Sequence, residues 1–320
     1  MQYRPYTFLR IILLPLAAGV AFAQTPAVPS HPASPPAGQA TPPASLREIF
    51  ASPFASRLAA ADTTTVSITP GGIVPVYSTN TTIQPGEWVS IYGNNLAPAL
   101  ATWNGDFPTS LGGTSVTFNV GNGEQGYLEF VSPTQINLQV PDFTPPVSGT
   151  VTVVVKNAKG SATSTVTLGQ FGPSFLLLDS THVAGIILRS DNSGAYGGGT
   201  YDIIGPTGSS LGYPTKAAKA GDSVVLFGVG FGPTNPPVTS GQPFSGAAPA
   251  ANPVQLTING TVLTFAPNGP NGPFTFAGLQ GAGLFQFNVT LPAGLGTGDV
   301  PLVGMVGGVQ TPSGVVISLQ

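Results

Sequence analysis

The chain has 320 residues, of which only 7% are charged, and its formal net charge is −3. This balance leaves no basic surface for nucleic acid or for an anionic membrane. The sequence contains no cysteine, which excludes disulfide bridges, thiolate metal sites and thiol nucleophiles. A hydrophobic fraction of 41% argues against disorder, because disordered chains combine low hydrophobicity with high charge. A surface with so few charges repels its own copies weakly, which favours self-association.

The N-terminus has the composition of a secretory signal peptide. Arg4 and Arg10 are followed by an apolar run over residues 11–20, and residues 21–23 (Ala-Phe-Ala) form a small-x-small cleavage site. The run is shorter than the roughly 20 residues that a membrane-spanning helix needs. An ordinary buried helix is the alternative. We predict a signal peptide over residues 1–23 and a secreted, periplasmic or cell-surface location, with no transmembrane segment in the mature chain.

Residues 24–65 are dominated by Pro and Ala, beginning with "TPAVPSHPASPPAGQATPPA" from Thr25. This composition is typical of a disordered, extended and semi-rigid tether. A short amphipathic helix is conceivable near its end, where Pro53 would interrupt it. We predict that the tether is a spacer without a core of its own.

From about residue 66 the apolar residues alternate with the period of a β-strand. In "PGEWVSIYGNNLAP" (85–98), Val89 and Ile91 share one face, and Trp88, Ser90 and Tyr92 share the other. The pattern returns in "AGDSVVLFGVGFGP" (220–233), again ending in a glycine and a proline-containing loop.

Three further segments repeat in the same order. Residues 114–120 correspond to 254–260, and residues 132–141 correspond to 282–292, where Gln and Asn recur at matched positions. Residues 148–168 correspond to 297–319, a predicted hairpin in each case. Four matched segments in one order indicate an internal duplication. Each copy carries about six or seven short strands with frequent turn signals, the pattern of an antiparallel β-sandwich.

These motifs resemble a family of exported proteins from environmental bacteria. The resemblance rests on Pro-Gly, a strand, a glycine and Asn-Leu-Ala, followed by "SLGGTSV", "FVSPTQINLQVP" and the paired hairpins, and it covers residues 66–320. The C-terminal region of that family is related to the IPT/TIG class of Ig-like domains. The resemblance implies an all-β fold of two tandem Ig-like (IPT/TIG-type) antiparallel β-sandwiches after a signal peptide and a Pro-rich tether. It implies binding, adhesion or spacing roles and supplies no catalytic residues.

The expected domains are residues 66–170 and 171–320. The second domain begins with two predicted strands, in "SFLLLD" and "HVAGIILRS", and then carries a long insertion rich in Gly and Tyr. Long ordered loops are often functional, so this connection is of interest.

Three patterns look catalytic at first sight. His182 has Asp179, Ser180 and Asp191 nearby in sequence, but a catalytic triad is recognised by geometry, and we interpret His182 as structural. "GSSLG" (208–212) matches the nucleophile elbow around Ser210, yet the prolines on either side leave no place for the required helix. "GVGFG" (228–232) has the wrong glycine spacing for a dinucleotide loop.

The remaining polar residues form no recognised site. Glutamates are scarce, "DNSG" (191–194) lacks the alternating ligands of a calcium loop, and the three N-x-Ser/Thr triplets reflect composition. We therefore predict no catalytic residue, cofactor or metal.

Loop aromatics are the remaining candidates for binding. Trp103 and Phe107 lie on the loop after the first repeated strand, where exposed rings would stack on a sugar or anchor a protein partner. The alternative is that both rings close the end of the sandwich. The same two interpretations apply to Tyr196, Tyr201 and Tyr213.

The sequence favours a non-enzymatic exported protein with a binding, structural or adhesion role. Its expected partner is an extracellular protein or polysaccharide. One alternative is a carbohydrate-binding module that acts through Trp103, and a second is a hydrolase on a β-sandwich scaffold, because a fold does not determine an activity.

Overall fold

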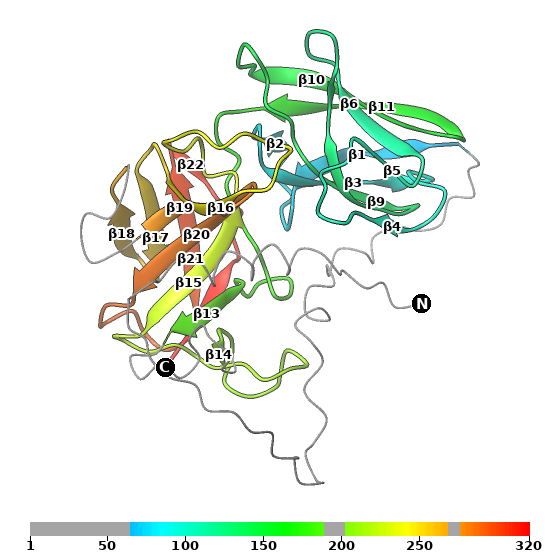
Figure 1. The fold of residues 1–320 in the computed structure, drawn as a ribbon. Helices are drawn as coiled ribbons and strands as arrows, with labels where there is room; N and C mark the ends of the chain where they lie inside the picture. Colours follow the sequence, from blue (N-terminus) through cyan, green and yellow to red (C-terminus); the bar gives the residue numbers. More distant parts are fainter. Residues whose placement is uncertain (1–64, 189–201, 268–275) are drawn as a thin grey trace, which may run out of the picture.

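The computed structural model describes residues 65–188, 202–267 and 276–320. The predicted signal peptide, the tether up to residue 64 and part of the Gly/Tyr-rich insertion lie outside the described residues, as do His31, Asp191, Tyr196 and Tyr201. Within the described ranges every regular element is a β-strand, so the fold is all-β (Figure 1).

The first half of the chain forms two sheets. One sheet has the order β1 (Ser67–Pro75), β3 (Trp88–Asn94), β9 (Gln135–Gln139), β8 (Tyr127–Val131) and β4 (Ala101–Thr102). The other has the order β2 (Thr82–Ile83), β11 (Gly160–Leu168), β10 (Gly149–Asn157), β6 (Thr114–Phe118) and β5 (Ser110–Leu111), with β7 (Glu124–Gln125) beside β6. Their pairings are antiparallel except for the short contact of β2 with β11.

The second half repeats this two-layer arrangement. The larger sheet runs β14 (Asp202–Ile203), β13 (Gly185–Leu188), β15 (Ser223–Val229), β20 (Leu284–Thr290), β19 (Phe276–Gly281) and β16 (Ser245–Pro249), with β12 (Ser174–Phe175) beside β15. The facing sheet runs β18 (Thr261–Phe265), β17 (Val254–Ile258), β21 (Gly298–Val306) and β22 (Val309–Gln310), with β23 (Val316–Leu319) beside β21. The expected boundary at residue 170 falls between β11 and β12.

Each sandwich buries its own core between its two sheets. Val89 and Ile91 of β3 belong to the core of the first sandwich, and Val224 and Leu226 of β15 belong to the core of the second. All four side chains are fully buried, as their strand alternation predicts.

The matched segments occupy equivalent places in the two sandwiches. Strand β3 pairs with β9 in the same register in which β15 pairs with β20. A side-chain hydrogen bond recurs at the same place: Gln135 Nε2 donates to Asn137 Oδ1 at 2.8 Å, and Gln286 Nε2 donates to Asn288 Oδ1 at 2.7 Å. The C-terminal hairpins agree as well, because Gly149 pairs with Leu168 and Gly298 pairs with Leu319.

The turn before each repeated strand is capped by an acidic side chain. Glu87 Oε1 accepts a hydrogen bond from Gln84 N at 2.8 Å, and Asp222 Oδ2 accepts one from Lys219 N at 3.1 Å. The glycine before each acid has a positive φ, 82° in the first turn and 85° in the second. This left-handed conformation explains the Gly in both Pro-Gly-Glu and Ala-Gly-Asp.

Candidate functional site

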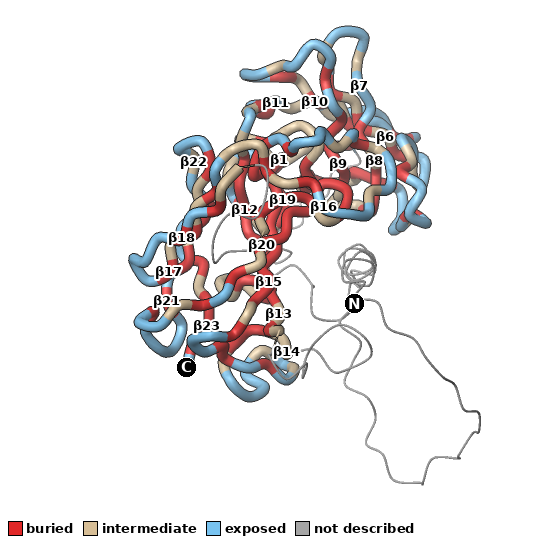
Figure 2. The backbone as a smooth tube through the Cα atoms, turned by 60° about the vertical axis from the view of Figure 1, so that its left-hand side comes forward, coloured by how far each residue is buried: buried red, intermediate tan, exposed pale blue. Residues whose placement is uncertain are grey.

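The two sandwiches meet at a buried cluster that contains side chains from both. The first sandwich contributes Val76, Trp88, Trp103 and Phe107, and the second contributes Leu176, Leu178, Ala184, Val225, Phe227, Val229, Ala282 and Leu284. We call this set the inter-sandwich cluster. Trp88 is fully buried in it, and its indole Nε1 donates to the backbone oxygen of Ala282 at 2.6 Å. Buried backbone is continuous where the two halves of the chain meet (Figure 2).

The aromatic rings singled out by the sequence lie within this cluster. Trp103 is 5% exposed and Phe107 is 8% exposed. Their ring centroids are 4.5 Å apart, and Trp103 meets Trp88 edge-on at 5.6 Å. The rings are therefore packed between the sandwiches and are not presented to solvent. A ligand-binding role for Trp103 and Phe107 stays a prediction, and it would require the rings to move.

Tyr213 also packs against the inter-sandwich cluster. Its hydroxyl oxygen is buried, and it has no hydrogen-bond partner among the described residues. Burial raises the pKa of Tyr213 well above its usual value, and the charge of Asp179 adds to this rise. Tyr213 therefore stays protonated and keeps its donor.

Polar side chains of the first sandwich bind backbone groups of the second. Gln84 Oε1 accepts a hydrogen bond from Gly232 N at 2.6 Å, and Gln139 Oε1 accepts one from Gly241 N at 2.9 Å. Asp142 and Ser240 form a reciprocal pair: Ser240 N donates to the carboxylate at 2.8 Å, and Asp142 N donates to the hydroxyl at 2.9 Å. These bonds fix the register of one sandwich against the other.

Four of the residues that make this contact differ between the two copies. Their counterparts in the second copy are Lys219 for Gln84, Ser223 for Trp88, Thr290 for Gln139 and Ala293 for Asp142. No substitution in this set is conservative. The contact surface is therefore specific to the first copy and is not a general property of the repeat.

A cavity of about 580 Å³ lies between the sandwiches. Its apolar wall includes Pro85, Phe143, Pro233, Val238 and Phe285, and its polar groups include Gln84, Glu87, Gln139, Asp142 and Thr234. Cavities of this size that lie between domains and have apolar walls with a few polar groups are typical of small-molecule sites. We take this cavity as the candidate functional site.

Glu87 is the most unusual polar group in the cavity wall. Its side chain is 1% exposed, and its Oε2 atom has no hydrogen-bond partner among the described residues. Burial raises the pKa of Glu87 well above its usual value, although the hydrogen bond from Gln84 N acts in the opposite direction. Burial therefore favours the neutral, protonated form of the Glu87 carboxyl group.

A second buried acid, Glu129, lies on β8 of the first sandwich. It is 1% exposed, and neither of its carboxyl oxygens has a hydrogen bond of good geometry within the described residues. Burial raises the pKa of Glu129 to about 8, and the Asn137 side chain offsets this only in part. Burial also raises the pKa of Tyr77, with the charge of Glu129 adding to the effect. Sequence reasoning missed both glutamates, because strand alternation alone does not show that these two side chains are buried.

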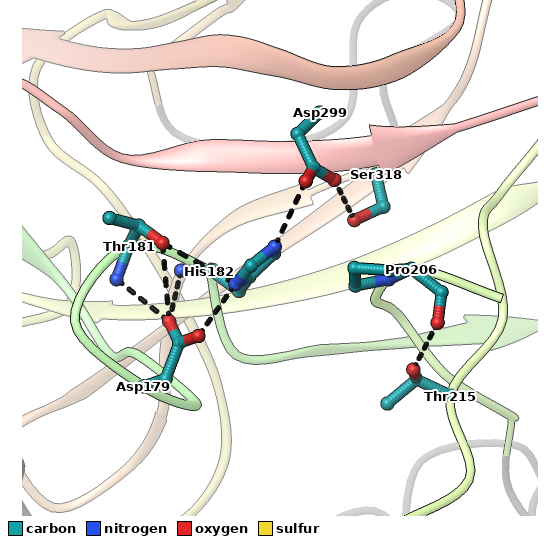
Figure 3. Close-up of polar contacts among 7 residues, drawn as sticks. All are labelled: Asp179, Thr181, His182, Pro206, Thr215, Asp299 and Ser318. Carbon is teal, nitrogen blue, oxygen red and sulfur yellow. Dashed lines mark hydrogen bonds and ion pairs between the residues drawn. The ribbon is translucent and has the colours of Figure 1, made fainter. Parts of the chain in front are cut away.

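His182 lies between two carboxylates and holds two parts of the second sandwich together (Figure 3). Its Nδ1 is 2.8 Å from Asp179 Oδ2, and its Nε2 is 3.3 Å from Asp299 Oδ2. Ser318 Oγ donates to the other oxygen of Asp299 at 2.6 Å. Each ring nitrogen therefore already has a carboxylate as its hydrogen-bond partner. This geometry agrees with the structural interpretation of His182.

Hydrogen bonds also set the direction in which the pKa of Asp179 shifts. Burial alone would raise the pKa of Asp179, but backbone N–H donation from His182 and Thr181, together with the His182 ring, lowers it below its usual value. Its Oδ1 accepts those two backbone bonds, each at 2.7 Å. The carboxylate therefore caps its own turn as well as pairing with the ring.

The other motifs have structural explanations. Ser210 is exposed in a turn where Gly212 N donates to Ser209 O, and no helix follows it in the described residues. Residues 228–232 end β15, and Gly230 and Gly232 have positive φ values of 74° and 95°. In the described parts of the chain, no group of three or more His, Cys, Asp or Glu residues is placed to hold a metal ion. Those parts also contain no helical stretch with the length and apolar character needed to cross a membrane.

No protein-family model matches the sequence, and no curated protein matches it. Among solved structures, the chain is similar to the titin Ig tandem domains, with 11% identity over 75% of this chain and 91% of that chain and a TM-score of 0.21. It is also similar to bovine butyrophilin, with 9% identity over 80% of this chain and 98% of that chain and a TM-score of 0.20. Likenesses this weak carry no argument, so the assignment rests on the two-layer antiparallel strand pairing. The fold is Ig-like. The candidate site is thus a cavity between Ig-like sandwiches.

Proposed function

We propose that this chain is an exported, non-enzymatic binding or structural protein built from two IPT/TIG-like domains, residues 66–170 and 171–320. The observation that carries the proposal is the buried contact between the sandwiches, in which Trp88 binds Ala282 across the interface. Such a contact joins two recognition modules into one unit with a fixed arrangement of loops. An extracellular protein or a polysaccharide is the expected partner.

The arrangement of reactive groups supports a role without catalysis. Both ring nitrogens of His182 face carboxylates, and Ser210 lies in an exposed turn. A hydrolase needs a nucleophile and a base within hydrogen-bond reach of each other. His182 and Ser210 form no such hydrogen bond with each other in the structure.

The test of export is direct. Expression of the full chain in a bacterial host should release a mature protein that begins at Gln24, measured by N-terminal sequencing of the periplasmic and medium fractions. A full-length chain retained in the cytoplasm would contradict export.

The test of binding uses the same mature protein on immobilised polysaccharides and on cells of a strain that lacks the gene. We expect retention of the protein with no release of soluble products. Product release that disappears in His182→Ala or Ser210→Ala would overturn the non-enzymatic proposal.

A carbohydrate-binding role is the second candidate. The indole Nε1 of Trp103 is buried and has no acceptor among the described residues, and a sugar hydroxyl would supply one. Retention on insoluble polysaccharides should then fall at least about tenfold in Trp103→Ala, the effect of losing a ring–sugar contact. Equal retention of the wild type and the variant would assign the ring to packing alone.

A further inference from the structure

We propose that the cavity between the sandwiches binds a small, uncharged organic molecule that presents an acceptor oxygen, and that Glu87 donates a hydrogen bond to this oxygen. This inference rests on the proposed binding function and adds to it a site and a chemical class of ligand. It starts from a difference between the two copies of the repeat.

The turn that contains Glu87 does not require a glutamate. In the second copy, Asp222 caps the equivalent turn through Lys219 N with a side chain one methylene shorter. In the first copy, Glu87 Oε1 makes the same cap, and Oε2 lies near Gly230 of the second sandwich. A Cβ atom on Gly230 would lie 2.3 Å from Oε2, so this oxygen lies against the Gly230 backbone. The extra length thus brings a buried polar atom of a cavity-lining residue against the second sandwich, where it has no hydrogen-bond partner among the described residues.

The hydrogen bond at Oε1 decides which oxygen carries the proton of the neutral acid. Oε1 accepts the N–H of Gln84, so the proton of a neutral carboxyl resides on Oε2. Oε2 is then an O–H donor that has no hydrogen-bond partner among the described residues, and leaving a buried donor unpaired is costly. An oxygen atom of a ligand in the cavity would remove that cost. Because Oε2 is covered in the ligand-free chain, we expect binding to shift the side chain slightly toward the ligand.

The rest of the wall selects for an uncharged ligand. Among the described residues, the only ionisable ones that line the cavity are Glu87 and Asp142, and Asp142 already accepts the hydrogen bond from Ser240 N. No Lys, Arg or His of the described part of the chain lines the cavity, so an anion would find no cationic partner among these residues. A cation would find only the carboxylate of Asp142, which already accepts the Ser240 N–H, because burial opposes the ionisation of Glu87. Apolar contacts with Phe143, Val238 and Phe285 would hold the body of a neutral ligand.

The first experiment compares two probes on the mature wild-type chain. The fluorescent ketone 6-propionyl-2-(dimethylamino)naphthalene presents one carbonyl oxygen, and 2-(dimethylamino)naphthalene lacks it. We expect the ketone to bind about tenfold more tightly, the usual worth of one buried hydrogen bond. Equal affinities, or tighter binding of a trimethylammonium analogue, would overturn the proposed ligand class. Val238→Trp, which fills the cavity, should abolish binding, and unchanged binding would place the probe elsewhere.

The second experiment uses the chain's own second copy as a guide to variants. Glu87→Asp recreates the second copy's acid at this turn, so it should keep the cap, withdraw the donor and weaken ketone binding about tenfold. Asp222→Glu is the matched control and should leave binding unchanged. Glu87→Gln keeps an N–H donor at the same reach and should bind the ketone nearly as the wild type does. A folded Glu87→Asp variant with wild-type affinity would overturn the role of Glu87.

A pH titration separates Glu87 from Asp142, the other titratable group in the wall. Wild-type affinity for the ketone should fall toward alkaline pH, because an ionised Glu87 has no proton to donate. In Glu87→Gln the affinity should not change with pH, and a fall that persists in this variant would assign the effect to another group. Failure of all the probe experiments would leave export and polysaccharide retention untouched, so the two proposals fail separately.

Discussion

Glu87 and Glu129 are buried carboxyl groups near the contact between the sandwiches, and both have raised pKa values for the same reason. Both side chains are buried away from water and receive few hydrogen bonds, and no cationic side chain of the described residues lines the cavity beside Glu87. A group whose pKa is raised on folding holds its proton more tightly in the folded state. Its contribution to stability is therefore greatest at low pH.

The contribution of Glu129 to the pH dependence of stability should be large enough to measure. Its pKa rises from 4.5 to about 8, so the free energy of unfolding should fall as pH increases through that range. The fall from this one group is on the order of 5 kcal/mol, because each pKa unit corresponds to 1.36 kcal/mol. In Glu129→Gln this part of the pH dependence should vanish, as measured by urea unfolding at a series of pH values. Glu124→Gln, at an exposed position, is the control, and an identical pH dependence in all three proteins would contradict the prediction.

Asp179 should show the opposite pH dependence. Its pKa is lowered on folding, so its contribution is present above the ordinary aspartate pKa and is lost as pH falls through the lowered value. Asp179→Asn keeps an acceptor for the backbone bonds and should cost about 1 kcal/mol, whereas Asp179→Ala should cost about 2 kcal/mol by removing the cap as well. Thermal unfolding of the wild type and of Asp179→Asn between pH 3 and 7 tests this. A stability loss in Asp179→Asn that grows as the pH falls would contradict the prediction.

Among the elements, β3 and β15 show how far the sequence could predict this molecule. Alternation placed Val89 and Val224 in the two cores correctly, since the core face of each strand is independent of the other sandwich. The opposite face of β3 could not be assigned in this way, because Trp88 becomes buried only when the second half of the chain covers it. The uninterrupted apolar run of β15, from Val224 to Phe227, is the signal that both of its faces are buried.

The candidate cavity was harder to predict for the same reason. Its wall combines residues far apart in sequence, and local patterns do not show which sandwich faces which. The burial of Trp103 and Phe107 in the inter-sandwich cluster is hidden from local patterns for the same reason. Comparison of the two copies would have helped. Glu87 against Asp222 and Gln139 against Thr290 are departures from an otherwise matched pattern, and the first member of each pair lines the cavity.

In the turn after β15, the backbone of Gly230 lies very close to Gly172 and Glu87, and a glycine substitution can test this packing. Gly230 has a φ of 74°, and a Cβ there would lie 2.1 Å from Gly172 O and 2.3 Å from Glu87 Oε2. Gly260 has a similar φ of 82°, but a Cβ there meets nothing within 4 Å. Gly260→Ala should therefore cost only backbone strain, about 1 to 2 kcal/mol, and Gly230→Ala should cost clearly more. Equal losses in denaturant unfolding would show that the contact between the sandwiches tolerates displacement.

At the scale of the whole molecule, the inter-sandwich cluster should make the two sandwiches unfold together. Trp88→Ala removes the central ring and its hydrogen bond to Ala282. The free energy that couples the unfolding of the two sandwiches should therefore fall by about 3 to 5 kcal/mol. Calorimetry should then resolve two transitions where the wild type has one. Val89→Ala, on the opposite face of the same strand, should destabilise the first sandwich while leaving the coupling intact. A single transition in Trp88→Ala would show that other contacts suffice.

The difference between the two copies also limits how these sandwiches associate. The contact is heterologous: the first copy contributes side chains around Gln84 and Trp88, at one end of its sandwich, and the second copy contributes the face of β15 that carries Val225 and Phe227. A heterologous contact extends into filaments when every unit carries both surfaces. Here neither surface is duplicated: the second copy has Lys219 and Ser223 at the end position, and the first has Ser90 and Tyr92 where the face has Val225 and Phe227. A third sandwich would find no complementary patch at either side. Growth through this contact stops at the pair, and any self-association has to use a different part of the surface.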